Sequence, residues 1–164
     1  MGRYRPPPPP KSPYITAHGE SLLRAEEKQL WQRRRGVVEA LSAAAAEGDR
    51  SENAEYIYRK KELGGIDRRI RYLQKRLPQL KVVRQKPATN DRVYFSASVE
   101  LEDETGIRTR YRIVGADEFD LQDHYISVDS PLARALLKRE LGDSLSVSTP
   151  GGETRYQIIA IEYG

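Results

Sequence analysis

Apolar residues recur at helical spacing through the first half of the chain. Thr16 is the candidate N-cap of the first helix. After it, apolar residues repeat every seven positions, at Leu23, Leu30, Val37 and Ala44, and Trp31 and Leu41 widen the stripe. In a second segment the steps alternate between three and four, through Leu63, Ile66, Ile70, Leu73, Leu77 and Leu80. That spacing is the a/d seam of a coiled coil. Each helix would have about 30 residues and a length of about 45 Å. The short connection around Gly48 makes them antiparallel neighbours.

The pattern changes after a linker at residues 86–90. Strand-like segments occupy residues 93–99, 109–114 and 125–128, with a turn at residues 103–106 between the first two. Residues 145–148 and 156–163 form a closing hairpin. Ser130 and Pro131 begin one helix as its cap and first residue, and Gly142 ends it. We predict an α+β fold: an N-terminal antiparallel α-helical coiled-coil hairpin at residues 14–86, and a C-terminal antiparallel β-sheet domain with one helix at residues 87–164.

Two segments break the periodic pattern. Residues 1–13 contain the consecutive prolines Pro6 to Pro10, which favour an extended conformation. We expect a disordered tail there, with docking to a proline-reading partner as the alternative. Gly64 and Gly65 interrupt the second helical segment at a cost of about 2 kcal/mol relative to alanine. They would mark a bend or a close approach of the partner helix.

Composition and charge narrow the classes of function. The 164 residues include no cysteine, which excludes disulfide scaffolds and cysteine-bound zinc. No apolar run approaches the length of roughly 20 residues that spans a bilayer, so we expect a cytoplasmic protein without membrane association. Residues 1–86 carry a net charge of +10, and residues 87–164 a net charge of −6. This asymmetry favours a basic half that meets nucleic acid or another anion, although long helices can simply carry many charges.

An acidic turn lies between the two helical segments, from Glu47 to Glu55. Asp49 and Glu52 are three residues apart, so on a helical turn they would share one face. Two carboxylates at that spacing can hold a hard cation such as Mg²⁺ or position a water. The alternative is a capping box, with Asp49 as the N-cap and Glu52 reaching back to its amide.

A basic run with interleaved tyrosines follows the turn. It comprises Arg59, Lys60, Lys61, Arg68, Arg69, Arg71, Lys75 and Arg76, with Tyr56, Tyr58 and Tyr72 among them. Cations suit phosphates and rings suit unpaired bases, as in single-stranded RNA binding. A solvated helix surface with packed tyrosines is the alternative. His18 and His124 are isolated, and no glycine-rich phosphate loop is present. A catalytic role for the acidic turn would therefore need residues from a partner.

Six segments of the chain resemble the bacterial Gre transcript cleavage factors. They are residues 48–56, 60–61, 66–73, 112–115, 125–137 and 159–163. The match covers roughly residues 14–163. The Asp-Arg-Ser-Glu-Asn turn and the Arg-Arg-x-Arg-Tyr-Leu run are similar to the GreB branch of the family.

The resemblance implies a mechanism and a set of partners. Such factors bind backtracked bacterial RNA polymerase, and the coiled coil enters its secondary channel. Asp49 and Glu52 would be the catalytic and metal-binding pair, holding Mg²⁺ only together with the polymerase active centre. The polymerase then cleaves the nascent RNA 3′ end, which rescues arrested complexes. The factor itself would not be an enzyme, and we expect it to act as a monomer.

The resemblance also assigns the supporting residues. Ser51, Asn53 and Glu55 would support the tip. Arg59, Lys60, Lys61, Arg68, Arg69 and Arg71 would bind the extruded RNA. The C-terminal domain would be FKBP-like and contact the channel rim through Asp129, Ser130 and Pro131.

Three other functions remain open at this point. A non-catalytic regulator of the same channel would share the architecture without a tip metal. A prolyl isomerase would follow from the C-terminal fold alone, which is a weak analogy. A plain RNA-binding coiled coil would bind RNA without polymerase.

Overall fold

The computed structural model of the chain describes residues 2–49 and 52–164. It divides into two compact units. One unit is Glu20–Leu80, and the other combines the chain up to Gly19 with Lys81–Gly164. No helix in the described parts of the chain is long and apolar enough to cross a membrane.

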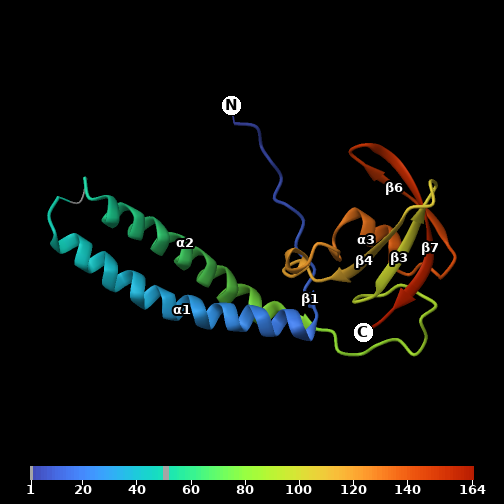
Figure 1. The fold of residues 1–164 in the computed structure, drawn as a ribbon, viewed down its shortest axis with the longest axis horizontal. Coiled ribbons are helices and arrows are strands. Elements are labelled where there is room, and N and C mark those ends of the chain that lie inside the picture. Colours follow the sequence, from blue (N-terminus) through green and yellow to red (C-terminus); the bar gives the residue numbers. More distant parts are fainter. Residues whose placement is uncertain (1, 50–51) are drawn as a thin grey trace. The chain divides into compact units, whose positions relative to one another are not determined.

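The first unit is the predicted helical hairpin. Helices α1 (Ala17–Ala46) and α2 (Ala54–Arg76) lie side by side and run antiparallel (Figure 1). Their centre is a buried cluster of Val37, Ile66 and Ile70, against which Leu30 and Leu63 pack. The seam read from the sequence is therefore the apolar contact between the helices, since residues three and four apart share one helix face.

Helix α2 is shorter than the seam predicts. It ends at Arg76, and a single 3₁₀ turn, η1 (Leu77–Gln79), follows. Pro78 has no N–H to continue the α-helical hydrogen bonds, so the helix cannot extend to Leu80. Leu77 is nevertheless buried, because the turn keeps its side chain on the apolar side.

Gly64 and Gly65 lie within α2, which continues through them without a break. A methyl group added at either glycine would meet only Arg68 of the same helix, at 3.4 Å from Gly64 and 3.7 Å from Gly65. The expectation of a close approach by the partner helix is therefore wrong. The two glycines leave open space on the surface of α2.

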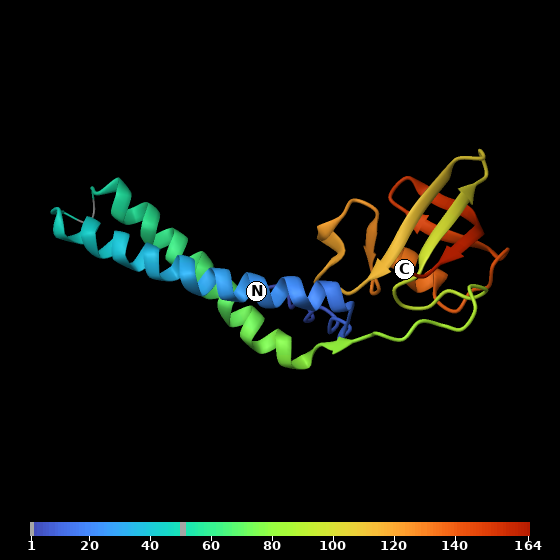
Figure 2. The ribbon, with the colours of Figure 1, turned by 60° about the horizontal axis from the view of Figure 1, so that its bottom comes forward.

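The second unit contains a five-stranded sheet with the strand order β5-β4-β3-β7-β6. Figure 2 shows this unit from a second direction. The strands are β3 (Ser98–Asp103), β4 (Arg108–Val114), β5 (Tyr125–Ser127), β6 (Ser144–Thr149) and β7 (Gly152–Glu162). The α+β class is confirmed. The sheet is mixed, because β5 pairs with β4 in parallel after a crossover that includes the 3₁₀ turn η2 (Phe119–Leu121).

Helix α3 (Pro131–Leu136) packs beside this sheet. Its predicted start is confirmed: the Ser130 hydroxyl accepts the Ala133 N–H at 3.2 Å, and Pro131 is the first helical residue. Its predicted end at Gly142 is wrong. The helix stops at Leu136, and Lys138 has a left-handed φ of 68° that turns the chain away. The buried faces of the sheet and helix form one apolar core.

The predicted strand at residues 93–99 is also wrong over most of its length. Ser96 has a φ of 71°, and the Ala97 N–H donates to the Tyr94 carbonyl at 3.1 Å, so a turn precedes β3. Val93 instead exchanges backbone hydrogen bonds with residues 138 and 139, at 2.7 and 2.9 Å. A partner far along the chain thus fixes this segment, and local strand propensity does not.

The two ends of the helical hairpin return to the second unit. Strands β1 (Tyr14–Ile15) and β2 (Lys81–Val82) pair in parallel. The Lys81 N–H donates to the Pro13 carbonyl at 2.8 Å, and the Val83 N–H donates to the Ile15 carbonyl at 3.0 Å. This pairing joins segments that are separated by the whole hairpin.

A buried carboxylate holds the first turn of α1 in this second unit. Glu118 is only 1 % exposed and accepts the backbone N–H of Thr16 at 2.9 Å and of Gly115 at 2.7 Å, as well as the Thr16 hydroxyl. Thr16 in turn accepts the Gly19 N–H at 3.1 Å, which confirms it as the cap of α1. A methyl group at Gly19 would lie 2.1 Å from the Glu118 carboxylate, so a larger residue there would displace this carboxylate.

Candidate functional site at the tip of the hairpin

The predicted carboxylate pair lies in the connection between α1 and α2. Helix α1 ends at Ala46 and α2 begins at Ala54, so Asp49 and Glu52 both lie outside the helices. Both side chains are exposed. Gly48 has a φ of 133°, a conformation that favours glycine, and this lets the chain leave α1 sharply. The expectation that the two carboxylates share a helical face is wrong. Ser51 lies outside the described residues.

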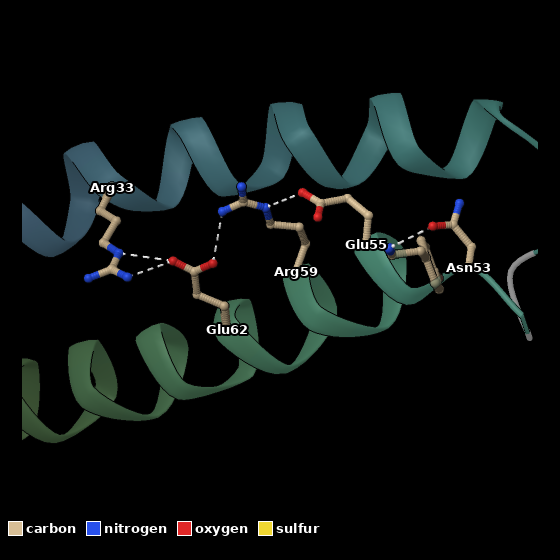
Figure 3. Close-up of polar contacts among 6 residues, drawn as sticks. Arg33, Asn53, Glu55, Arg59 and Glu62 are labelled. Atoms are coloured by element: carbon tan, nitrogen blue, oxygen red, sulfur yellow. Dashed lines mark hydrogen bonds and ion pairs between the residues drawn. The ribbon is translucent and has the colours of Figure 1, made fainter.

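Asn53 caps α2, and the capping-box alternative is therefore wrong. The Asn53 Oδ1 atom accepts the Tyr56 N–H at 3.1 Å, which is the geometry of an N-cap (Figure 3). The Asn53 Nδ2 atom donates to the Ala44 carbonyl near the end of α1 at 2.8 Å. One amide side chain thus joins the end of one helix to the start of the other. The Asp49 and Glu52 carboxylates are not needed for the N-cap of α2.

A chain of ion pairs continues from the tip along the hairpin (Figure 3). Arg59 donates to Glu55 at 2.8 Å and to Glu62 at 3.1 Å. Glu62 also accepts two hydrogen bonds from Arg33 of α1, at 3.0 and 2.7 Å. The Arg33 hydrogen bonds are the main cause that lowers the pKa of Glu62, and the hydrogen bonds to Glu55 and Glu62 raise the pKa of Arg59. The pair of Arg33 and Glu62 ties α2 to α1.

Two further ion pairs cross between the helices. Arg34 donates to Asp67 at 2.7 Å, and this hydrogen bond raises the pKa of Arg34. Arg69 binds both oxygens of Glu26, at 2.6 and 3.0 Å. Arg59 and Arg69, two of the predicted RNA-binding residues, are therefore engaged within the hairpin itself.

The other four predicted RNA-binding residues face solvent. Lys60, Lys61, Arg68 and Arg71 are exposed, and none of them forms an ion pair within the described chain. Among the interleaved rings, Tyr58 has 59 % of its surface exposed. Such a surface can contact phosphates and an unpaired base.

The predicted docking loop has internal partners that sequence reasoning did not anticipate. Ser130 caps α3, and the Asp129 carboxylate accepts the Ser12 N–H at 2.8 Å and the Ser12 hydroxyl at 2.5 Å. Beside them, Lys11 lies 3.6 Å from the Asp117 carboxylate. The end of the N-terminal tail therefore packs on this loop. No local pattern indicates a contact across more than 100 residues.

The donor set at the tip is incomplete for a cation held by this chain alone. No group of three or more histidine, aspartate or glutamate side chains converges within residues 2–49 and 52–164. Mg²⁺ prefers near-octahedral oxygen coordination, usually with one or two carboxylates and additional ligands from water or phosphate. A cation at Asp49 and Glu52 would need its remaining ligands from water or from a second molecule.

Comparison with known proteins agrees with both units. Residues 13–82 match the family model of the transcription elongation factor N-terminal domain, and residues 88–163 match that of the GreA/GreB C-terminal domain. The transcription elongation factor GreB of Pseudomonas aeruginosa is 57 % identical over 99 % of this chain and 98 % of its own length. GreB of Xanthomonas axonopodis is 53 % identical with the same coverage. Among solved structures, Gfh1 of Thermus aquaticus is 27 % identical, covers 94 % of this chain and 100 % of its own, and has a TM-score of 0.43.

A helical hairpin with an acidic tip, followed by an α+β domain, defines a two-domain transcription elongation factor. The chain belongs to the GreA/GreB family of transcription elongation factors. The resemblance to the GreB branch is confirmed by the identity over nearly the full length.

Proposed function

We propose that this transcription elongation factor enters the secondary channel of backtracked RNA polymerase and stimulates the polymerase's own cleavage of the RNA 3′ end. One observation carries the proposal: two exposed carboxylates lie at the far end of a helical hairpin, outside the cap that Asn53 supplies. A tip of this kind can be inserted into another molecule's cavity. The factor contributes ligands and is not an enzyme by itself.

Asp49 and Glu52 would hold Mg²⁺ together with ligands of the polymerase active centre. The ion, when bound, would supply an activated water and stabilise the leaving oxygen. The residues of this chain would contribute by holding the two carboxylates in position. Asn53 fixes the ends of both helices through hydrogen bonds of 2.8 and 3.1 Å, and so limits where the two carboxylates can lie. Positioning of this kind matters because small displacements of a reacting group cost large factors in rate.

The basic side of α2 would bind the extruded RNA. Lys60, Lys61, Arg68 and Arg71 are exposed cations whose side chains are not consumed by ion pairs in the described chain. Phosphate contacts of this kind give salt-dependent affinity without sequence preference. That suits a factor that must accept any transcript.

The C-terminal unit would contact the rim of the channel through Asp129, Ser130 and Pro131. The N-cap of α3 and the Ser12 hydrogen bonds hold this loop in one conformation. A preformed loop lowers the entropic cost of binding. One copy of the chain presents both the tip and the docking loop, so we propose that it acts as a monomer.

The proposal is tested on stalled, backtracked elongation complexes. Asp49→Ala and Glu52→Ala should each lower the saturating cleavage rate by about 100-fold or more, the scale of losing one charge-stabilising group, and added Mg²⁺ should restore part of it. Binding to the polymerase should stay unchanged. Glu47→Ala is the matched control, because Glu47 is an exposed carboxylate at the start of the same turn. Wild-type cleavage by both variants would refute the proposal. Tight binding by the wild type without RNA cleavage would identify a non-catalytic regulator.

A further inference from the structure

A groove of about 510 Å³ runs along one side of the hairpin. Six residues of α2 line it, and four of them, Tyr58, Lys61, Gly65 and Arg68, form a regular series along the helix. They step by three, four and three residues, so they share one helix face. Leu30 and Arg33 of α1 line the opposite side, and Ile66 adds to the apolar lining.

Gly65 is one reason the groove is open. A methyl group at this position would meet only the Arg68 guanidinium, at 3.7 Å, so a longer side chain would extend into the groove. Gly65 lowers the helix propensity of α2, and nothing in the packing of α1 requires a glycine there. Gly64, its neighbour, does not line the groove.

Tyr58 provides an aromatic surface at the groove. Tyr58 is 59 % exposed, so much of its ring surface is open to a ligand. The Arg59 guanidinium lies 5.5 Å from the centroid of the Tyr58 ring. Because Glu55 and Glu62 hold Arg59 at 2.8 and 3.1 Å, this cation–π contact also limits the motion of the ring.

The charges around the groove favour an anionic ligand. Glu62 is the only acidic group that lines it within the described chain, and Arg33 and Arg59 already neutralise that carboxylate. Lys61 and Arg68 are exposed and form no ion pair among the described residues. The groove thus combines an apolar base, an exposed ring and two available cations.

We propose that this groove binds one unpaired RNA base by stacking it on Tyr58, with the flanking phosphates on Lys61 and Arg68. This inference rests on the proposed function, which brings the extruded RNA to α2. It adds a base-binding subsite to the phosphate contacts. Stacking on a ring accepts every base because each has a π-face, so the subsite grips the transcript without reading its sequence.

The test uses complexes backtracked by several nucleotides, in which one extruded residue at a time is abasic. For the wild type, an abasic residue at one position should raise the factor concentration for half-maximal cleavage by about tenfold, the loss expected for one stacked base. Tyr58→Ala should cause the same increase with normal RNA and no further increase with the abasic RNA. Tyr58→Phe keeps the ring and should behave as the wild type.

The two glycines provide a matched pair of variants. Gly65→Leu fills the groove and should behave as Tyr58→Ala, whereas Gly64→Leu makes the same exchange outside the groove and should leave half-maximal cleavage unchanged. Both exchanges raise helix propensity to the same extent, so helix stability cannot account for a difference between them.

Two results would overturn the inference. One is an unchanged half-maximal concentration in Tyr58→Ala and Gly65→Leu. The other is an equal loss with normal and abasic RNA at every position, which would show that the groove contacts the polymerase instead. Either result would leave the proposed function intact as long as Asp49→Ala still abolishes stimulated cleavage. Normal cleavage by Asp49→Ala would refute the proposed function itself.

Discussion

The amide side chain of Asn53 should determine how firmly the tip is closed. It makes two hydrogen bonds, to the Ala44 carbonyl at 2.8 Å and from the Tyr56 N–H at 3.1 Å. Loss of an N-cap costs about 1 kcal/mol, and loss of a second hydrogen bond about 1 kcal/mol more. Asn53→Ala should therefore stabilise the opened tip by about 2 kcal/mol, which is about a 30-fold increase in its population.

Native-state hydrogen exchange measures this opening directly. The Tyr56 and Ile57 amides bond to Asn53 and should exchange about 30-fold faster in Asn53→Ala, while the Ile70 amide in the middle of α2 should be unaffected. Asn53→Ser separates the two bonds, because serine caps a helix well but is too short to reach Ala44. It should accelerate exchange only about fivefold.

The opened tip should also lower cleavage. In Asn53→Ala both carboxylates remain, but the saturating cleavage rate should fall because their position is less restricted. Unchanged exchange at Tyr56 in Asn53→Ala would refute the reasoning, since the amide would then not close the tip. Equal acceleration by alanine and serine would show that only the bond to Ala44 matters.

Two other predictions concern buried and paired carboxylates. Glu118→Ala leaves the Thr16 and Gly115 N–H groups without an acceptor in a buried site and should lower the free energy of unfolding by about 3 kcal/mol or more. The stability of Glu118→Gln should lie between that of the alanine variant and the wild type. A loss below about 1 kcal/mol in the alanine variant would contradict the role of Glu118 as a buried acceptor. The pKa of Glu62 is lowered in the folded chain, so its stabilising effect is complete above the pKa of the unfolded chain and is lost as the pH falls through the lower, folded pKa. A carboxyl chemical-shift titration should show this pKa rising in Arg33→Ala, and an unchanged titration would exclude Arg33 as its main cause.

The sequence predicts those features that depend on neighbouring residues. The seam through Ile66 and Ile70 and the helix starts at Thr16 and Ser130 all follow from spacing and capping chemistry within a few residues, and the structure confirms them. The turn at residues 103–106 is likewise local: Gly106 has a φ of 83°, and the Gly106 N–H donates to the Asp103 carbonyl at 3.1 Å.

Features that depend on distant partners were not predictable in this way. Residues 93–97 have strand propensity, but Val93 bonds to residues 138 and 139, and Ser96 and Ala97 bond to Ile113. From the sequence alone, Glu118 would be taken for an exposed surface carboxylate. In the structure it is buried and accepts a hydrogen bond from the Thr16 N–H.

At the tip, two capping patterns overlap in the sequence. Asp49-x-x-Glu52 and Asn53 are both consistent with a helix start, and only the backbone decides that α2 begins at Ala54. The paired and unpaired cations of α2 also could not be told apart from the sequence. Composition could not separate Arg59 and Arg69, which bind Glu55 and Glu26, from the cations that remain available.

The parallel pairing of β1 with β2 has a consequence for biosynthesis. The chain up to Gly19 belongs to the same compact unit as Lys81–Gly164, so that unit is interrupted by the entire hairpin. During translation its first segment leaves the ribosome early and must wait for the rest, while the hairpin already has all the residues that it needs. We therefore expect the helices to form first and the sheet unit to close last. A fragment expressed from residue 87 onward would lack β1, β2 and the Thr16 partner of Glu118, and should fold poorly.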